Sequence, residues 1–189
     1  MKKILFTLLL LITVLTTPAR QRQLFDAGWL FFLGDKPSMA SPDYNDASWR
    51  HLNLPHDWAI EGDFRDGNPS GAGGGALPGG IGWYRKHLAI SEKEASTLKT
   101  KKYWLAFDGV YMNSTVYVNG KEVGHRPYGY SSFEYDITPE LKTGDNVIAV
   151  KVDNSDQPNS RWYSGCGIYR HVWLTTTSTL HFDHWGVQV

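Results

Sequence analysis

The sequence contains a single cysteine in 189 residues, so no disulfide can form within the chain. A domain of this size must therefore be stabilised by its hydrophobic core alone. The cysteine, Cys166, lies between two glycines, where the chain needs a small residue. A free cysteine at such a place usually behaves as a small buried apolar side chain, so we favour this reading over a nucleophile.

An excess of charge of either sign is also missing, because 19 basic residues balance 19 acidic ones. This balance argues against a nucleic-acid partner and against a polybasic membrane-binding surface. Motifs for metal or nucleophilic chemistry are absent as well. The sequence has neither a His-Glu-x-x-His pattern nor a Gly-x-Ser-x-Gly elbow. His181 and His184 are three apart in a segment expected to be extended, so they face opposite sides. We therefore expect no metal and no cofactor.

Two local patterns could suggest active sites, but their context argues against this. His56 and Asp57 are neighbours in Pro55-His56-Asp57-Trp58, and neighbouring side chains of an extended chain point to opposite sides. A role in pinning a loop against the core is favoured over a catalytic dyad. Six glycines lie within residues 71–80, but no Gly-Lys-Ser or Gly-Lys-Thr ending follows them, so phosphate binding is not supported. The loop over residues 61–80 is too long for a plain connection, which indicates function or mobility.

The N-terminus has the pattern of a secretory signal peptide. Lys2 and Lys3 precede an apolar run over residues 4–15, and small residues follow up to Ala19. The run is too short to span a membrane. We therefore expect residues 1–19 to be removed, and a secreted or periplasmic chain that makes no membrane contact afterwards.

The rest of the chain has the pattern of an all-β domain. Apolar residues alternate with polar ones in several short segments, and no long helical pattern occurs. The first strand is expected over residues 24–33, and Asn119-Gly120 predicts a two-residue hairpin turn. A capping box, Ser91 with Glu94, predicts a short helical turn. With 19 glycines and nine prolines separating seven or eight strands, a β-sandwich is predicted.

The richest stretch runs from Arg161 to Trp173. It begins with a cation beside two aromatic rings, passes through Gly165-Cys166-Gly167 and ends in an expected strand. The two glycines predict a backbone with positive φ or a close approach. Aromatic rings stack on the C–H faces of sugars, and charged groups bond to sugar hydroxyls. From the residues alone, a buried aromatic corner remains the commoner use of such rings.

This stretch, RWYSGCGIYRHVWL, resembles the end of the N-terminal sugar-binding domain of glycoside hydrolase family 2, and secreted β-galactosidase-like members most closely. Further segments match in the family's order: residues 26–29, 48–50, 54–58, 82–86, 107–111, 118–120 and 129–133. The resemblance implies a jelly-roll β-sandwich, galactose-binding-domain-like, over residues 20–180. It also implies that residues 181–189 form a strand or linker towards an immunoglobulin-like domain and a catalytic barrel, both outside this chain.

The resemblance implies a carbohydrate, a β-glycoside, as ligand. Our candidate substrate-binding residues are Arg161, Trp162, Tyr163, Asp57 and Trp58. Some family members carry an aspartate at the place of Arg161, where it contacts the sugar and helps to hold a sodium ion. A guanidinium has no acceptor and cannot bind a cation, so that role is not carried over. Arg161 could instead donate bidentate bonds to sugar hydroxyls or to a carboxylate.

The family's two catalytic glutamates lie in the barrel, and glycoside hydrolysis normally needs such a pair. We therefore expect no catalytic residue in this chain and no hydrolysis by it alone. Three functions are open. The chain could form part of the active-site wall of a secreted family 2 glycosidase, it could be an independent carbohydrate-binding module, or it could be a structural domain that touches no sugar. The resemblance favours the first.

Overall fold

The structure is a computed structural model that describes residues 20–184 and 186. The expected signal peptide, residues 1–19, lies outside the described residues. Within them the chain forms strands with a few short helical turns. The elements are β1 (Arg20–Leu24), β2 (Trp29–Leu33), η1 (Pro37–Ala40), β3 (Arg50–Leu52), η2 (Ala59–Glu61), η3 (Ala72–Gly74), β4 (Gly80–Ile90), α2 (Glu92–Ser96), β5 (Lys101–Phe107), β6 (Ser114–Val118), β7 (Lys121–Arg126), β8 (Phe133–Asp136), η4 (Thr138–Glu140), β9 (Gly144–Asn154) and β10 (Val172–Ser178).

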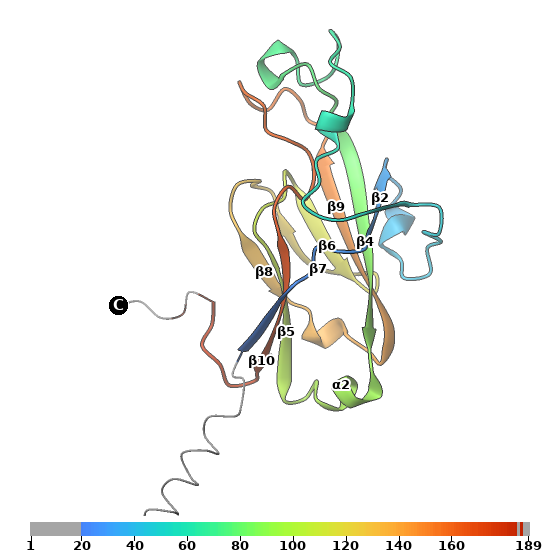
Figure 1. Ribbon diagram of the computed structural model, residues 1–189, viewed down its shortest axis with the longest axis vertical. Coiled ribbons are helices and arrows are strands. Elements are labelled where there is room, and N and C mark those ends of the chain that lie inside the picture. The colour runs from blue at the N-terminus through green and yellow to red at the C-terminus, as the bar shows by residue number, and fades with distance from the viewer. Residues whose placement is uncertain (1–19, 185, 187–189) are drawn as a thin grey trace, which may run out of the picture.

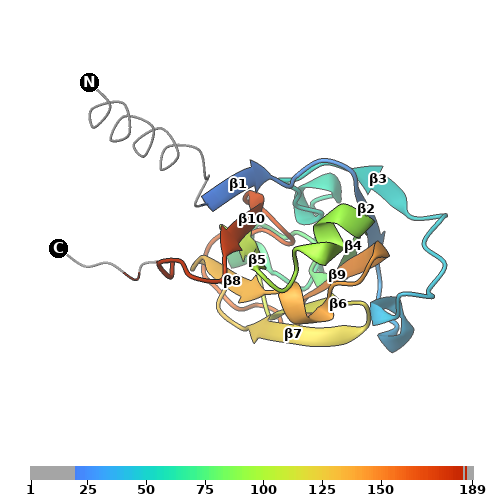
Figure 2. The same cartoon turned by 90° about the horizontal axis from the view of Figure 1, so that it is seen from below.

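The strands form two antiparallel sheets that face each other (Figures 1 and 2). The first sheet has the order β1-β10-β5-β8, and the second has the order β3-β2-β4-β9-β6-β7. Seen along the strands, the six-stranded sheet curves until β7 lies beside β8 (Figure 2). Gly124 of β7 permits this contact, because a Cβ atom there would lie 2.1 Å from the ring of Tyr135. The predicted all-β sandwich is confirmed.

The predicted first strand over residues 24–33 is wrong in one respect, because it is two strands in different sheets. β1 pairs with β10, whereas β2 pairs with β3 and β4. The chain crosses between the sheets at Asp26-Ala27-Gly28, where Gly28 has φ +71°. Asp26 and Gly28 interrupt the apolar residues between the two strands, but periodicity alone does not show that the chain changes sheet there.

The core fills the space between the sheets, and the strand patterns follow from it. Val116 and Val118 of β6 point inward and are fully buried. β9 is apolar without alternation over residues 147–150, because it is central and both of its faces are covered. Ile148 and Val150 enter the main core, while Ala149 joins a second cluster on the outer face of its sheet. Continuous apolar runs are typical of such doubly covered strands.

The second cluster closes the outer face of the six-stranded sheet under the segment of residues 34–49. It contains Leu30, Met39, Trp49, Trp83 and Ala149. Arg85 of β4 holds this segment in place although its side chain is fully buried. Its guanidinium donates to the Asp46 carboxylate at 2.6 Å and to three backbone carbonyls, those of Met39, Ser41 and Tyr44, at 2.6, 2.9 and 3.5 Å.

Other local predictions are confirmed. Ser91 and Glu94 form the capping box of α2. Asn119 and Gly120 both have positive φ, as a two-residue hairpin turn requires. After β10, residues 179–184 contain no strand, while the rest of the expected segment, residue 186 apart, lies outside the described residues. In residues 20–184 and 186 no helix is long and apolar enough to cross a membrane.

Candidate functional site

Two long segments meet at one end of the sandwich (top of Figure 1). The glycine-rich segment lies between η2 and β4, and the segment of residues 155–171 connects β9 with β10. Their backbones approach closely. A Cβ atom on Gly79 would lie 2.6 Å from the carbonyl oxygen of Asn154, and one on Gly73 would lie 3.7 Å from Cα of Arg161. We call this end of the molecule the loop end.

Asp57 ties the loop end together. Its Oδ1 accepts the N–H of Cys166 at 2.8 Å and the N–H of Ala59 at 2.9 Å. Its Oδ2 accepts the hydroxyl proton of Tyr163. Burial and the adjacent Asp57 carboxylate raise the pKa of Tyr163, so the phenol stays protonated and remains a donor. Asp57 therefore positions Tyr163 from below, while its own carboxylate is engaged within the chain.

His56 points away from Asp57, as expected for neighbours in an extended segment. Its Nδ1 lies 2.7 Å from the Tyr84 hydroxyl, and its Nε2 lies 2.6 Å from Nη2 of Arg50. Arg50 also donates to both carboxylate oxygens of Glu61, at 2.9 and 3.0 Å. Burial lowers the pKa of His56, which favours the neutral ring, and Arg50 can only donate, so Nε2 is the acceptor in this contact. The pair of residues pins the loop to the core and is not a dyad.

The bend around Cys166 has the geometry that the sequence predicts. Gly165 and Gly167 have φ +78° and +124°. A Cβ atom on Gly167 would lie 2.3 Å from the Tyr84 hydroxyl and 2.8 Å from the His56 carbonyl oxygen. Cys166 is 2% exposed, and burial raises the pKa of its thiol to about 12. A thiol in this state is not a nucleophile near neutral pH, which agrees with the small-residue reading.

Aromatic rings gather on the outside of the loop end. Trp162 and Tyr163 are 62% and 43% exposed. The indole N–H of Trp162 points to the hydroxyl of Tyr130 at 3.4 Å, and the rings of Tyr128 and Tyr130 lie 5.7 Å apart. Neither Tyr128 nor Tyr130 was predicted from the sequence to bind a ligand. The matching segment at residues 129–133 was the available signal for Tyr130, but its nearness to Trp162 depends on the tertiary fold.

The five candidate residues divide into an exposed and a buried group. Arg161 is exposed and forms no side-chain hydrogen bond or ion pair with any described residue. Trp58 is 3% exposed, stacks on Phe31 at 5.8 Å and donates its indole N–H to Gly79 O at 3.1 Å. The ring of Trp58 supports the loop end from the core and offers almost no surface to a ligand.

The space beneath the loop end is too small for a sugar. The cavity between the two segments, lined by Leu77, Asn154 and Cys166 among others, has a volume of about 20 Å³. That is room for about one water molecule. A sugar would therefore contact the outer surface, where Arg161, Trp162 and Tyr163 are exposed, and would not enter between the loops.

Comparison with known families identifies the domain. The model of the sugar binding domain of glycosyl hydrolases family 2 matches residues 77–178, which is more than half of the chain. The chain belongs to this family.

Several known proteins are similar in sequence or structure to most of this family 2 sugar binding domain. The β-galactosidase BoGH2A of Bacteroides ovatus is 58% identical over 90% of this chain, and a putative β-glucuronidase of Formosa agariphila is 49% identical over 84%. A crystal structure of a β-glycosidase from Bacteroides vulgatus is 49% identical over 82% of this chain, with a TM-score of 0.78. A family 2 member from Bacteroides cellulosilyticus is 43% identical over 87%, with a TM-score of 0.80.

The family 2 sugar binding domain described here corresponds to only a part of these proteins. It spans 20% of BoGH2A, 15% of the Formosa agariphila protein, and 20% and 22% of the two crystallised chains. The jelly-roll sandwich is therefore one domain of a larger glycosidase architecture in these relatives.

Proposed function

We propose that the chain is the sugar binding domain of a β-galactosidase-like family 2 enzyme and that its loop end forms part of the active-site wall. The observation that carries the proposal is the exposed group of Arg161, Trp162 and Tyr163 at the loop end, where Asp57 holds the hydroxyl of Tyr163. Aromatic faces and a guanidinium fork suit the two kinds of surface that a sugar offers. The BoGH2A relative is named a β-galactosidase, which supports a galactoside as substrate.

In this proposal the domain orients the sugar and performs no bond chemistry. Arg161 is free to reach a sugar hydroxyl or a carboxylate because it forms no side-chain bond with the described residues. Tyr163 is 43% exposed while Asp57 holds its hydroxyl. Trp58 and Gly79 keep the floor of the loop end in place. Bond cleavage belongs to a barrel domain outside this chain, as the resemblance implies.

The test is Arg161→Ala in the complete enzyme, with nitrophenyl β-galactoside as substrate. Loss of a charge-assisted bond costs about 1.5–3 kcal/mol, so kcat/KM should fall roughly tenfold to a hundredfold. The melting temperature should hardly change, because Arg161 is exposed. Arg161→Lys should restore only part of the activity, because a point charge cannot reproduce a planar fork.

Arg20→Ala is the matched control, because Arg20 is an exposed arginine at the start of β1, next to Thr177. It should leave both kcat/KM and the melting temperature unchanged. Unchanged kinetics for Arg161→Ala would contradict the proposal. Turnover by the 189-residue chain alone would contradict the division of labour between the domains.

An independent carbohydrate-binding module is the second candidate. The exposed rings at the loop end favour it, since they are accessible without any other domain. Calorimetric titration of the chain with lactose separates the two functions. Millimolar or tighter affinity of the isolated chain supports a module, whereas affinity that appears only in the complete enzyme supports the active-site wall.

The proposal includes export from the cytoplasm, based on the basic start and the apolar run of residues 4–15. Mass spectrometry of the protein isolated from its source organism tests it. The mature chain should begin near Arg20. A cytoplasmic chain that keeps residues 1–17 would contradict it.

A further inference from the structure

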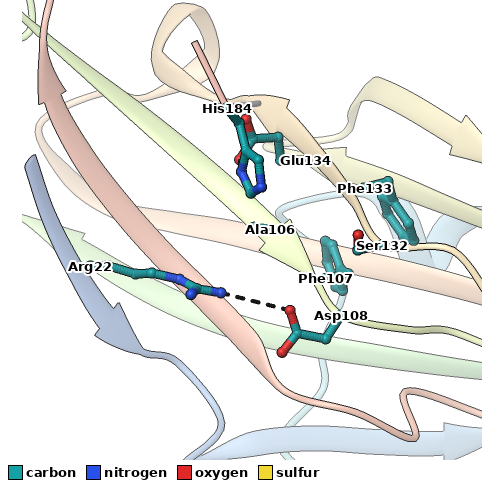
Figure 3. Close-up of a pocket in the computed structure, with 8 residues that line it drawn as sticks. All are labelled: Arg22, Ala106, Phe107, Asp108, Ser132, Phe133, Glu134 and His184. Carbon is teal, nitrogen blue, oxygen red and sulfur yellow. Dashed lines mark hydrogen bonds and ion pairs between the residues drawn. The ribbon is translucent and has the colours of Figure 1, made fainter. Parts of the chain in front are cut away.

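A second hollow lies away from the loop end, on the outer face of the four-stranded sheet (Figure 3). Its volume is about 440 Å³, within the range of small-ligand sites. Its lining residues come from β1, β5, the segment before β8, β8 itself and the segment after β10. They are Arg22, Ala106, Phe107, Asp108, Ser132, Phe133, Glu134 and His184.

The strand register explains why the sheet is hollow here. Leu24, Trp173, Ala106 and Glu134 stand side by side across the four strands, so their side chains share the outer face. Alanine is the smallest of the four, and it stands between an indole and a glutamate. The floor is therefore low at Ala106 and the walls are high on both sides.

One wall is a fixed group of three side chains. The guanidinium of Arg22 lies 3.9 Å above the ring of Trp173, and its Nη2 is 3.7 Å from Oδ1 of Asp108. The other oxygen of Asp108 accepts the indole N–H of Trp173 at 2.9 Å. Arg22 and Asp108 therefore form an ion pair, but their atoms are too far apart for a hydrogen bond. Guanidinium protons and carboxylate lone pairs are thus held beside the hollow with bonding capacity to spare.

The opposite wall carries a second carboxylate. Oε2 of Glu134 lies 2.8 Å from Nδ1 of His184. The hydroxyl of Ser132 lies at the end of the hollow nearer to Phe133 (Figure 3). The side chains of Asp108 and Glu134 are 36% and 19% exposed, so both are in reach of a solute.

We propose that this hollow binds a neutral sugar residue, independently of the loop end. Two carboxylates and one guanidinium line the hollow, so an anionic ligand would meet repulsion, whereas neutral hydroxyls can pair with both kinds of group. Carboxylates accept hydroxyl protons and a guanidinium donates to hydroxyl oxygens, with charge-assisted strength. A pyranose presents vicinal hydroxyls on several sides of its ring, and a hollow of about 440 Å³ has room for one such ring. The chemistry is therefore that of a polyol.

Trp173 supplies a direct reporter of occupancy, because its indole N–H is bonded to Asp108 at the edge of the hollow. We expect the indole cross-peak in ¹H–¹⁵N spectra of the 189-residue chain to shift in a saturable way with methyl β-galactopyranoside. Tetrahydropyran, which has the ring but no hydroxyls, should cause no shift. Methyl β-glucuronide, which adds a carboxylate, should bind no more tightly than the galactoside.

Two variants test whether the ligand binds in the hollow. Ala106→Leu raises the floor and should abolish the saturable shift. Arg22→Met keeps the cover over Trp173 but removes the donor, and should weaken binding by about tenfold, the effect of roughly 1.4 kcal/mol. Trp162→Ala, a loop-end variant, should leave the shift unchanged. This control separates the second hollow from the proposed function, which can fail without affecting it.

Several results would overturn the proposal. One is a Trp173 shift that stays linear in galactoside concentration, and another is an unchanged shift in Arg22→Met. Loss of the shift in Trp162→Ala would show that the sugar binds only at the loop end. If Ala106→Leu does not fold, Arg22→Met and the tetrahydropyran comparison still decide the question.

Discussion

Two arginines show how differently the two outer faces of the sandwich are built. Arg85 lies on the outer face of the six-stranded sheet, is fully buried, and donates to one carboxylate and three carbonyls. Arg22 lies on the outer face of the four-stranded sheet, where its side chain is 45% exposed. It covers Trp173, and among the described residues its ion pair is a long one with Asp108.

The difference between the two arginines shows which outer face is covered by other parts of the chain and which is open to solvent. A buried guanidinium is tolerated only where hydrogen bonds and a counter-charge offset its desolvation, so Arg85, with four acceptors, marks a face covered by the chain's own segment 34–49. The exposed Arg22 keeps unused donors, so the face around it can still accept a ligand. An arginine therefore stabilises the fold on one face of the molecule, whereas on the other face an arginine is available to bind a ligand.

Replacing the buried arginine should have the largest effect. Arg85→Met leaves the carbonyls of Met39, Ser41 and Tyr44 without this donor and leaves the Asp46 carboxylate with only His87 as a side-chain partner among the described residues. Breaking a buried pair in this way costs about 3–5 kcal/mol, which corresponds to a melting temperature lower by about 6–20 °C. Calorimetry or urea unfolding of the chain measures it.

Arg22→Met is the matched control for this substitution. Surface ion pairs contribute about 0–1 kcal/mol, and methionine can still cover the indole of Trp173. Its melting temperature should therefore stay within about 3 °C of that of the wild type. Equal losses from the two substitutions would remove the contrast between the faces.

Two glycines with positive φ also differ in whether their surroundings are densely packed or open. Gly167→Val should lower the free energy of unfolding by more than about 2 kcal/mol, because backbone strain and a clash with Tyr84 add together. Gly144 also has positive φ, at +88°, but a Cβ atom there would have no neighbour within 4 Å. Gly144→Val should therefore cost only the strain, about 1–2 kcal/mol. If urea unfolding shows the same loss for both variants, packing around Gly167 contributes nothing.

A smaller effect should appear in the pH dependence of stability, with opposite signs at two histidines. Burial lowers the pKa of His56, so the unfolded chain takes up the proton first and stability falls as pH drops below about 6.5. Burial also opposes charge on His87, but hydrogen bonds to Asp145 and Asp46 outweigh it and raise the pKa. The contribution of His87 is therefore present below about 6.5 and is lost as pH rises through the raised pKa.

Urea unfolding between pH 5 and pH 8 separates the two histidines. His56→Gln should flatten the loss of stability towards acid, and His87→Gln should flatten the loss towards neutral pH. The slopes are the test, because either substitution can also shift stability uniformly. An unchanged slope in either variant would show that the corresponding pKa shift is absent.

Local patterns in the sequence predicted much of this molecule. The alternation around Val116, the Ser91 capping box, the Asn119-Gly120 turn and the positive φ of Gly165 and Gly167 all depend on a few neighbouring residues. Each needs only short-range sterics or hydrogen bonding, which is why the pattern was sufficient. The crossing between β1 and β2 was missed because the short interruption at Asp26 and Gly28 does not reveal which sheet the next strand joins.

Pairings between distant residues could not be read in the same way. The acceptors of Arg85 lie 39 to 46 positions away, and Asp57 meets Cys166 across 109 positions. Such partners are set by sheet order and register. The hollow at Ala106 has the same origin, since its walls come from strands far apart in the sequence. The β-sandwich could be predicted from the sequence. Which residues meet at its surfaces could be learned only from the tertiary structure.

The single buried cysteine gives this domain a built-in probe of loop motion. Cys166 lies under the two segments of the loop end and hydrogen bonds to Asn154, so a thiol reagent can reach it only when those segments separate. Because no other thiol competes, the rate of labelling reports how readily those segments open, and at high reagent concentration it approaches the opening rate itself. A sugar that bridges the loop end would slow the labelling, and a sugar held only at Ala106 would leave its rate unchanged.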